Sequence, residues 1–229
     1  MTPPPTTGRP RVRDDVAYLL PMGAFLALTW AGGNWPATYP YTYTAKTLVA
    51  AALLWALWRH YTPPRWSHLG LGVLVGVVGV FQWVLMEKGL LALWPDYPRA
   101  RMDPVDPFSY FDSPAADWAW IAVRLLGPAL VVPVMEELFW RDFLWRSLLA
   151  PNDFKLAHVG EWDGKVFAMV AVFFAGVHLQ MWATSVVWAV LVGWLLVRTR
   201  SLGACIVAHG VTNLLLGAYV LWTKDWMFW

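Results

Sequence analysis

The 229-residue sequence contains a single cysteine, Cys205, and few charged side chains. One cysteine excludes an internal disulfide. Asp, Glu, Lys and Arg make up only 14% of the residues, whereas soluble domains contain about 25%. The formal net charge is +2 and no run of Lys or Arg is present. This charge pattern gives no support for nucleic acid as a partner.

Hydrophobic residues are abundant, at 59% of the chain, and 18 residues are tryptophan. Many of these tryptophans lie at the ends of apolar runs, where an amphipathic ring is favoured at the level of the lipid headgroups. Soluble domains are only about 45–50% apolar. The composition therefore predicts an all-α, multi-pass transmembrane helical bundle with the lipid bilayer as its surroundings.

The apolar runs give the expected organisation of the chain, since a spanning helix needs about 20 mostly apolar residues. The candidates are residues 16–31, 46–58, 69–94, 117–150, 165–181, 183–199 and 203–223. The fourth is too long for one crossing and contains Pro128 and Pro133, which kink or break a helix. Counted once it gives seven spans, and split at Pro133 it gives eight. We expect one domain over residues 16–229, preceded by a disordered cytoplasmic tail at residues 1–15.

Lys and Arg in short loops predict the orientation, because they are enriched on the cytoplasmic side. With seven alternating helices, one side would carry Arg9, Arg11, Arg13, Arg59, Arg65, Arg198 and Arg200. The loop at residues 95–116, on the other side, contains Asp96, Asp103, Asp106 and Asp112 against Arg99 and Arg101. The pattern indicates a protein of the cell membrane with a cytoplasmic N-terminus.

A small set of polar residues lies inside the predicted spans, although each ionisable group there costs roughly 2.5–3.5 kcal/mol at the helix centre. The set is Glu136, Glu137, Arg141, His178, His209 and Asn213. Glu87, Lys88 and Arg124 are also embedded, and we expect Glu87 and Lys88 to lie near the far interface. Polar residues at such a cost usually face a partner or a cavity.

The spacing of this set assigns different roles to two adjacent carboxylates. Glu137 and Arg141 are i,i+4 neighbours on one helical face and can form an ion pair. Glu136 is offset by about 100° around the helix, so that pair need not neutralise it. His209 and Asn213 are also i,i+4 neighbours, which places an imidazole beside an amide.

A free carboxylate, two imidazoles and an amide can together hydrolyse an amide bond. Glu136 would act as the general base, and His178 would share and orient the water. His209 and Asn213 would donate hydrogen bonds to the oxyanion of the tetrahedral intermediate. These residue types predict hydrolysis of a peptide bond within a membrane.

Three motifs in this order resemble those of a known family. The sequence reads "EELFWR", "FAGVH" and "HGVTN", or EExxxR, FxxxH and HxxxN, on successive apolar segments within residues 117–223. This resembles the CAAX protease and bacteriocin-processing (CPBP, or ABI) family, which includes the type II CAAX prenyl endopeptidases. It is also similar to the short CAAX-protease-related proteins associated with bacterial exosortase sorting. The likeness covers about residues 131–215.

The resemblance implies an intramembrane endopeptidase of glutamic type that cleaves a membrane-associated protein or peptide. The implied catalytic residues are Glu136, His178, His209 and Asn213, supported by Glu137 and Arg141. It favours a mechanism without a cofactor. The alternative is a divalent metal such as zinc, held by Glu136, His178 and His209 with an open position for water.

Other interpretations remain open from the sequence. A non-catalytic membrane scaffold or immunity protein on the same fold would use the polar cluster only for folding, and a transporter would use Glu136 and His178 as a proton relay. Cys205 lies four residues before His209, so a cysteine nucleophile is a further alternative. A shared site also meets a geometric difficulty. At 1.5 Å per residue, Glu136 and His178 would lie about 20 Å from the cytoplasmic helix ends and His209 only about 9 Å.

Overall fold

The computed structural model describes residues 13–100, 104 and 106–229. Residues 1–12 of the expected tail, and Arg101 and Asp103 of the expected non-cytoplasmic loop, lie outside the described residues. The last two residues of that tail were predicted wrongly. Asp14 and Asp15 form the acidic first turn of the first helix, where carboxylates complement the positive helix N-terminus.

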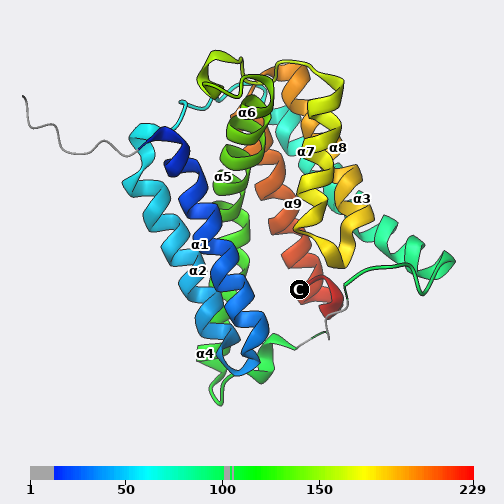
Figure 1. Cartoon of the computed structure of the whole chain (residues 1–229). Helices are drawn as coiled ribbons and strands as arrows, with labels where there is room; N and C mark the ends of the chain where they lie inside the picture. Colours follow the sequence, from blue (N-terminus) through cyan, green and yellow to red (C-terminus); the bar gives the residue numbers. More distant parts are fainter. Residues whose placement is uncertain (1–12, 101–103, 105) are drawn as a thin grey trace, which may run out of the picture.

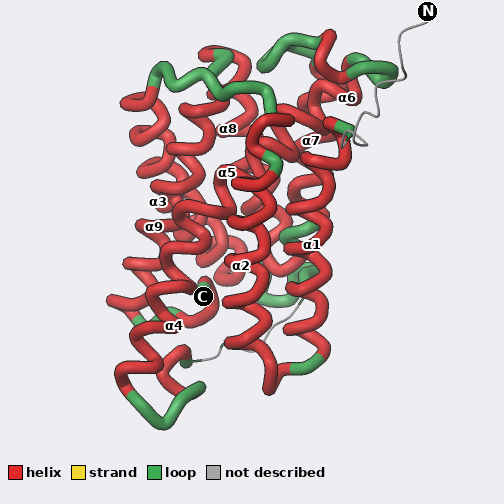
Figure 2. Tube along the Cα trace, turned by 90° about the vertical axis from the view of Figure 1, so that its left-hand side faces the viewer, coloured by secondary structure: helices red, strands yellow, loops and turns green. Residues whose placement is uncertain are grey.

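The described part of the chain is helical and contains no strand (Figures 1 and 2). The α-helices are α1 (Asp14–Asn34), α2 (Tyr39–Ala56), α3 (Leu69–Leu93), α4 (Pro114–Leu126), α5 (Val132–Glu137), α6 (Trp145–Leu149), α7 (Gly164–Gly176), α8 (Trp182–Thr199) and α9 (Leu202–Thr223). Helices α1 and α2 lie side by side, and α5 lies between this pair and α9 (Figure 1). The prediction of an all-α bundle is confirmed.

Five helical segments among the described residues are long and apolar enough to cross a membrane. They are Asp14–Asn34, Leu69–Leu93, Pro114–Leu149, Leu179–Thr199 and Leu202–Thr223. Helix α7 is apolar but short, and α2 carries tyrosines, threonines and Lys46 in its first half. The protein is therefore a multi-pass membrane protein, and the predicted number of seven to eight spans is not confirmed.

The long fourth segment continues past both prolines instead of breaking. Helices α4, α5 and α6 are joined by two π-helical turns, Gly127–Val131 and Leu138–Leu144, into one 36-residue segment. A π turn lets a helix absorb an irregular hydrogen-bond register without ending, and such turns are frequent at functional sites. The division into two spans at Pro133 is therefore not supported, and the two π turns flank Glu136 and Glu137.

Helix α3 packs closely on α9 through glycines. A Cβ atom at Gly72 would lie 2.5 Å from the carbonyl oxygen of Ala204, and one at Gly76 would lie 2.6 Å from that of Ala208. Small residues four apart let two membrane helices approach until their backbones touch. This contact fixes α9, which carries His209 and Asn213, against α3.

Candidate active site

The predicted site residues line one small cavity in the middle of the bundle. Its volume is about 160 Å³, and it is lined by Trp83, Val132, Glu136, Phe174, His178, Trp188, His209, Thr212, Asn213 and Leu216. These residues come from α3, α5, α7, α8, α9 and the turn after α7. The four predicted catalytic residues, Glu136, His178, His209 and Asn213, therefore share one enclosure.

The two adjacent glutamates have the different environments that their spacing predicts. Glu137 is fully buried, and its Oε1 accepts hydrogen bonds from Arg141 Nη1 at 3.2 Å and from His209 Nδ1 at 2.9 Å. Glu136 is 7% exposed and lines the cavity, and neither of its oxygens accepts a hydrogen bond among the described residues, whereas in Glu137 only Oε2 lacks a partner. One carboxylate is thus held by a cation and an imidazole, while the other is available to a ligand in the cavity.

Aromatic rings complete the surroundings of Arg141. Its guanidinium lies over Phe174, 4.7 Å from the ring centroid, and over Trp188 at 5.5 Å. The Trp188 ring also meets the His209 ring edge-on, at 4.6 Å between centroids. Cation–π contacts of this kind gain strength where water is excluded. Sequence reasoning missed Trp188, because nothing distinguishes it from the other tryptophans before the chain folds.

His178 lies just outside the helix in which we expected it. Helix α7 ends at Gly176, and His178 occupies the turn that follows. Its Nδ1 donates to the Phe174 carbonyl oxygen at 2.8 Å, and the two rings stack at 4.3 Å. The same carbonyl oxygen also accepts the Val177 N–H at 3.3 Å, so the His178 ring adds a second donor at the end of α7. The bond from the ring fixes the proton on Nδ1 and leaves Nε2 of the neutral ring as an acceptor.

The Asn213 amide is oriented by the proline that follows the first π turn. Val132 N–H donates to the Gly127 carbonyl oxygen five residues back. In that register the next carbonyl, Pro128 O, faces Pro133, which has no N–H to donate. Asn213 Nδ2 supplies the missing donor from α9, at 2.8 Å. The second hydrogen of this NH₂ group is left for the cavity.

The structure also removes the mismatch in depth between His209 and the other site residues. The depths calculated from the sequence at 1.5 Å per residue assumed that α9 starts at the surface. In the structure, Ser201, Leu202 and Ala204 are buried. The loop before α3 covers this end: Gly203 N–H and the Ser201 hydroxyl both donate to the Arg65 carbonyl oxygen. The start of α9 is therefore covered by this loop, and His209 lines the same cavity as Glu136 and His178.

The two remaining chemical alternatives find no support in the geometry. Cys205 is fully buried, does not line the cavity, and its thiol lies 3.7 Å from the Val192 carbonyl oxygen. Within the described ranges, no three His, Cys, Asp or Glu side chains come together as a group that could hold a metal ion. Glu136, His178 and His209 share the cavity but are not grouped in this way, and a mechanism without a metal stays a prediction.

Glu87, which was expected near the far membrane interface, is fully buried in the protein near the end of α3. It accepts hydrogen bonds from Tyr97 and from Thr184 Oγ1. Burial raises the pKa of the Tyr97 phenol, so this residue stays protonated and donates to the carboxylate. Lys88 reaches the surface as expected and pairs with Asp225. Glu87 joins α3, the following loop and the start of α8 around the turn that holds His178.

A second buried ion pair was not recognised from the sequence. Arg146 pairs with Asp142 one turn earlier and also donates to the Ala157 carbonyl oxygen and to Thr62 Oγ1. Tyr18 donates to Asp142 at 2.6 Å. The i,i+4 spacing of Asp142 and Arg146 is the signal that could have revealed them. The pair ties α1 and the covering loops to the long helical segment.

These features define a class of protein: a multi-pass helical membrane protein with a cavity lined in part by carboxylate, imidazole and amide groups. Residues 118–215 match the family described as type II CAAX prenyl endopeptidase Rce1-like. The match confirms the resemblance to the CAAX protease and bacteriocin-processing family, and it supports a protease-type hydrolase. No curated protein and no solved structure matches the chain. The exosortase-associated branch stays a prediction.

Proposed function

We propose that this protein is an intramembrane endopeptidase that hydrolyses a peptide bond of a membrane-associated protein or peptide. The observation that carries the proposal is the contrast between two neighbouring carboxylates. Oε1 of Glu137 accepts hydrogen bonds from Arg141 and His209, whereas Glu136 lines the cavity and accepts no hydrogen bond from any residue that the structure describes. A carboxylate buried only for structure is normally hydrogen-bonded. A free one beside His178 is suited to act on a water molecule.

In the proposed reaction, Glu136 accepts a proton from a water molecule whose other hydrogen is donated to His178 Nε2. The oxygen of that water forms a bond to the carbonyl carbon of the peptide, and the carbonyl oxygen becomes an oxyanion. Glu136 then passes its proton to the leaving amine as the C–N bond breaks. General acid–base groups of this kind contribute about 10²–10⁴-fold to rate.

The oxyanion would be stabilised by the two groups on α9. Asn213 has one N–H committed to Pro128 and the other available. His209 directs its Nδ1 proton toward Glu137, so Nε2 is the ring nitrogen that can donate to the oxyanion when it carries a proton. Arg141 donates to the same carboxylate oxygen of Glu137. Glu137 and Arg141 would thus position His209 instead of touching the substrate.

A cleavage assay tests this function. The purified full chain in detergent is incubated with a pool of membrane-anchored peptides, and the products are identified by mass spectrometry. Cleavage at defined peptide bonds is the expected result. If the folded wild type cleaves no member of the pool and His178→Ala changes only stability, the polar cluster serves folding. The alternative of a non-catalytic scaffold or immunity protein would then replace the protease.

His178→Ala is expected to lower the cleavage rate by about 10²-fold or more, because the water loses its second hydrogen-bond partner. The cause is local, so the unfolding temperature in detergent should change little. His60→Ala provides the control, because it also removes an imidazole that makes a hydrogen bond. His60 Nδ1 lies 2.9 Å from Asp14 Oδ1 at the start of α1, outside the cavity. An equal loss of rate in both variants would contradict the role of His178.

The orientation of the protein in the membrane is a further part of the proposal. Arg13, Arg59, Arg65, Arg198 and Arg200 all lie at the end of the bundle where α1 and α3 begin and α2 and α8 end. By the enrichment of Lys and Arg on the cytoplasmic side, this end faces the cytoplasm. In intact spheroplasts, a cysteine introduced at Ser67 should resist a membrane-impermeant maleimide in a Cys205→Ala background. Labelling of this cysteine before lysis would contradict a cytoplasmic location of this end and would indicate the opposite orientation.

A further inference from the structure

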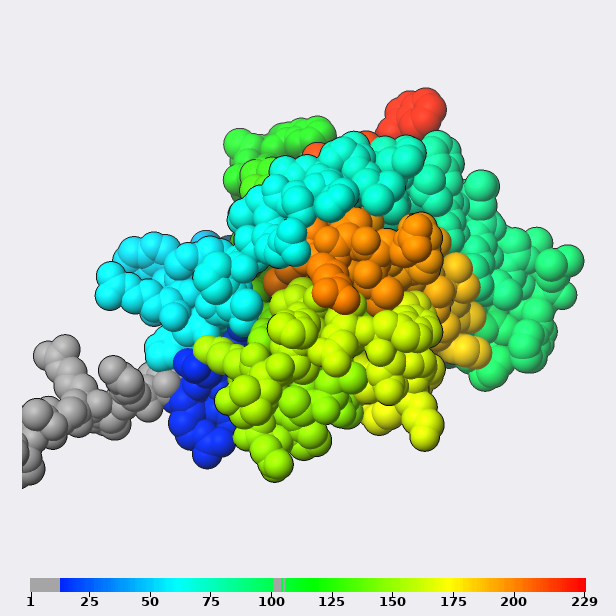
Figure 3. Space-filling model, turned by 90° about the horizontal axis from the view of Figure 1, so that it is seen from above, coloured from blue at the N-terminus to red at the C-terminus, as the bar shows by residue number. Residues whose placement is uncertain are grey.

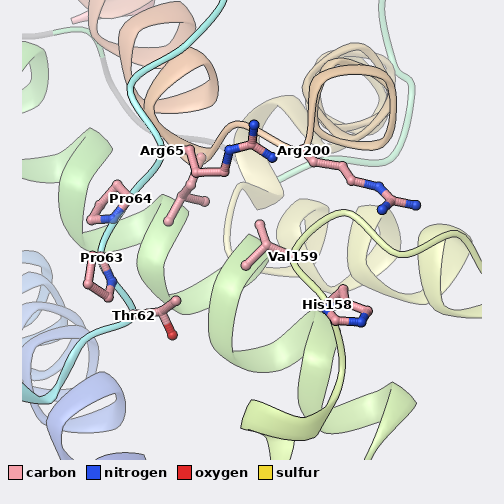
Figure 4. A pocket seen from close by; sticks show the side chains of 8 residues that line it. Thr62, Pro63, Pro64, Arg65, His158, Val159 and Arg200 are labelled. Atoms are coloured by element: carbon pink, nitrogen blue, oxygen red, sulfur yellow. The ribbon is translucent and has the colours of Figure 1, made fainter.

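A second, larger cavity lies at the Arg-rich end of the bundle, away from the candidate active site. Its volume is about 280 Å³, and it is lined by residues 62–65, His158, Val159, Arg200 and Leu202. Figure 4 shows Arg65 and Arg200 along one edge, His158 and Val159 facing them, and Thr62 with the two prolines along the remaining side. Three separate segments, which meet at this end in Figure 3, therefore build one basic cavity.

The backbone that carries Arg65 is fixed by the start of α9. The Arg65 carbonyl oxygen accepts a hydrogen bond from Gly203 N–H at 3.0 Å and another from the Ser201 hydroxyl at 2.7 Å. A Cβ atom at position 203 would lie 2.6 Å from that carbonyl oxygen, so glycine is required for this contact. The Arg65 side chain is exposed, while its backbone is fixed by these two hydrogen bonds from the start of α9.

Arg200 is also held, in a conformation that favours glycine. It caps α8 with φ of 49°, in the left-handed region, and its N–H donates to the Leu196 carbonyl oxygen at 2.7 Å. Helices usually place glycine at this position because a side chain there is strained. Gly160, with φ of +72°, lets the loop of His158 and Val159 approach the end of α8: a Cβ there would lie 2.7 Å from the Leu196 carbonyl oxygen. A long cationic side chain occupies a site where the backbone alone would favour glycine.

The cations of this cavity differ from those inside the protein by having no partner. Arg141 and Arg146 each pair with a carboxylate. By contrast, the side chains of Arg65, Arg200 and His158 make no hydrogen bond or ion pair within the part of the chain that the structure describes. The carboxylate nearest in sequence, Glu161, accepts from the His158 backbone N–H at 3.0 Å. The cavity therefore presents positive charge that the protein itself does not neutralise.

Exposed tryptophans place this cavity at the level of the lipid headgroups. Trp58, Trp66, Trp162 and Trp194 all lie near this end of the bundle and are 48–63% exposed. Trp and Tyr are enriched at the membrane–water interface, and basic pockets between helices on the cytoplasmic side bind anionic headgroups. The apolar lining from Pro63, Pro64, Val159 and Leu202 suits the glycerol part of a lipid.

We propose that the cavity between residues 62–65, the loop of His158 and Val159, and the α8–α9 turn binds the phosphate of an anionic ligand, with Arg65 and Arg200 as its main contacts. Two guanidinium groups suit a phosphate because each can offer paired N–H donors to its oxygens. A phospholipid headgroup and a free phosphate share this chemistry, and the position of the cavity at the interface favours the lipid. This site is separate from the proposed catalytic cavity and does not depend on proteolytic activity.

The test measures thermal unfolding of the purified full chain in a neutral detergent. The additions are phosphatidylglycerol, phosphatidylcholine, or inorganic phosphate at matched ionic strength. Wild type is compared with the Arg65→Gln/Arg200→Asn variant, in which asparagine tolerates the left-handed backbone. The control variant is Arg59→Gln/Arg198→Asn, which removes the same charge from two exposed arginines at the same end but outside the cavity.

Phosphatidylglycerol should raise the unfolding temperature of wild type and of the control variant, and phosphatidylcholine should not. The concentration needed for half of that effect should rise at least tenfold in the Arg65→Gln/Arg200→Asn variant. Protection by inorganic phosphate alone, lost in the same variant, would support the site and assign it to a soluble anion. An equal loss in both variants, or no protection of wild type by inorganic phosphate together with equal effects of phosphatidylglycerol and phosphatidylcholine, would overturn the proposal.

Discussion

Replacing Glu136 by glutamine is expected to reduce peptide cleavage by at least about 10³-fold while the protein stays folded. Glutamine has the same shape as glutamate but cannot accept a proton from water at neutral pH. The Glu136 Oε2 atom has no partner among the described residues, so the substitution breaks no recorded hydrogen bond at that oxygen. The measurement is the single-turnover cleavage rate, with thermal unfolding in the same detergent recorded in parallel.

Glu137→Gln is the matched comparison, because it makes the same chemical change at the adjacent residue. It weakens the contacts to Arg141 and His209 and should therefore lower stability as well as activity. The two variants should therefore behave differently: Glu136→Gln should lose activity but keep its stability, and Glu137→Gln should lose activity and stability. An active Glu136→Gln enzyme, or equal unfolding of both variants, would remove Glu136 from the role of general base.

Arg141→Met is expected to have the largest effect on stability, lowering the free energy of unfolding by about 3–5 kcal/mol. Methionine can occupy much of the volume between Phe174 and Trp188, so the loss does not come from an empty space. It comes from Glu137, whose buried charge would lose its cationic partner. Unfolding of wild type and variant in the same detergent, by heat and by denaturant, measures the difference.

The double variant Glu137→Gln/Arg141→Met separates the ion pair from the packing. Without the charge on Glu137, the missing cation matters less, and the double variant should recover part of the stability that Arg141→Met loses. Arg198→Met, at an exposed position, should change stability by less than about 0.5 kcal/mol. If Arg141→Met is as stable as wild type, the buried pair does not hold the site together.

Local sequence relationships predicted a large part of the site. The i,i+4 spacing of Glu137 and Arg141 fixed their ion pair, because residues four apart share one face of a helix. The same rule separated Glu136 from that pair and placed His209 beside Asn213. The order of the three motifs indicated the family whose description matches residues 118–215, and all three motifs lie within that range. The positions of the apolar runs predicted an all-helical membrane bundle, though not the number of its spans.

Partners far apart in the chain could not be predicted in the same way. His209 meets Glu137 across 72 residues, and Asn213 meets Pro128 across 85. Both contacts depend on how closely α9 packs against the long fourth segment. The burial of Glu87 was not predicted, because a lone carboxylate in an apolar run gives no sign of the Tyr97 and Thr184 hydroxyl groups that donate to it.

The sequence by itself determined that this chain is a helical membrane protein and that one of two adjacent glutamates is paired. These properties depend on composition and on helical periodicity, which are local. Only the tertiary structure decided that Asp142 and Arg146 form a second buried ion pair, that a loop covers the start of α9, that one cavity joins Glu136, His178, His209 and Asn213, and that Arg65 and Arg200 share another. The physical reason is that depth and enclosure depend on helix packing and loop coverage, and no short-range pattern in the sequence encodes them.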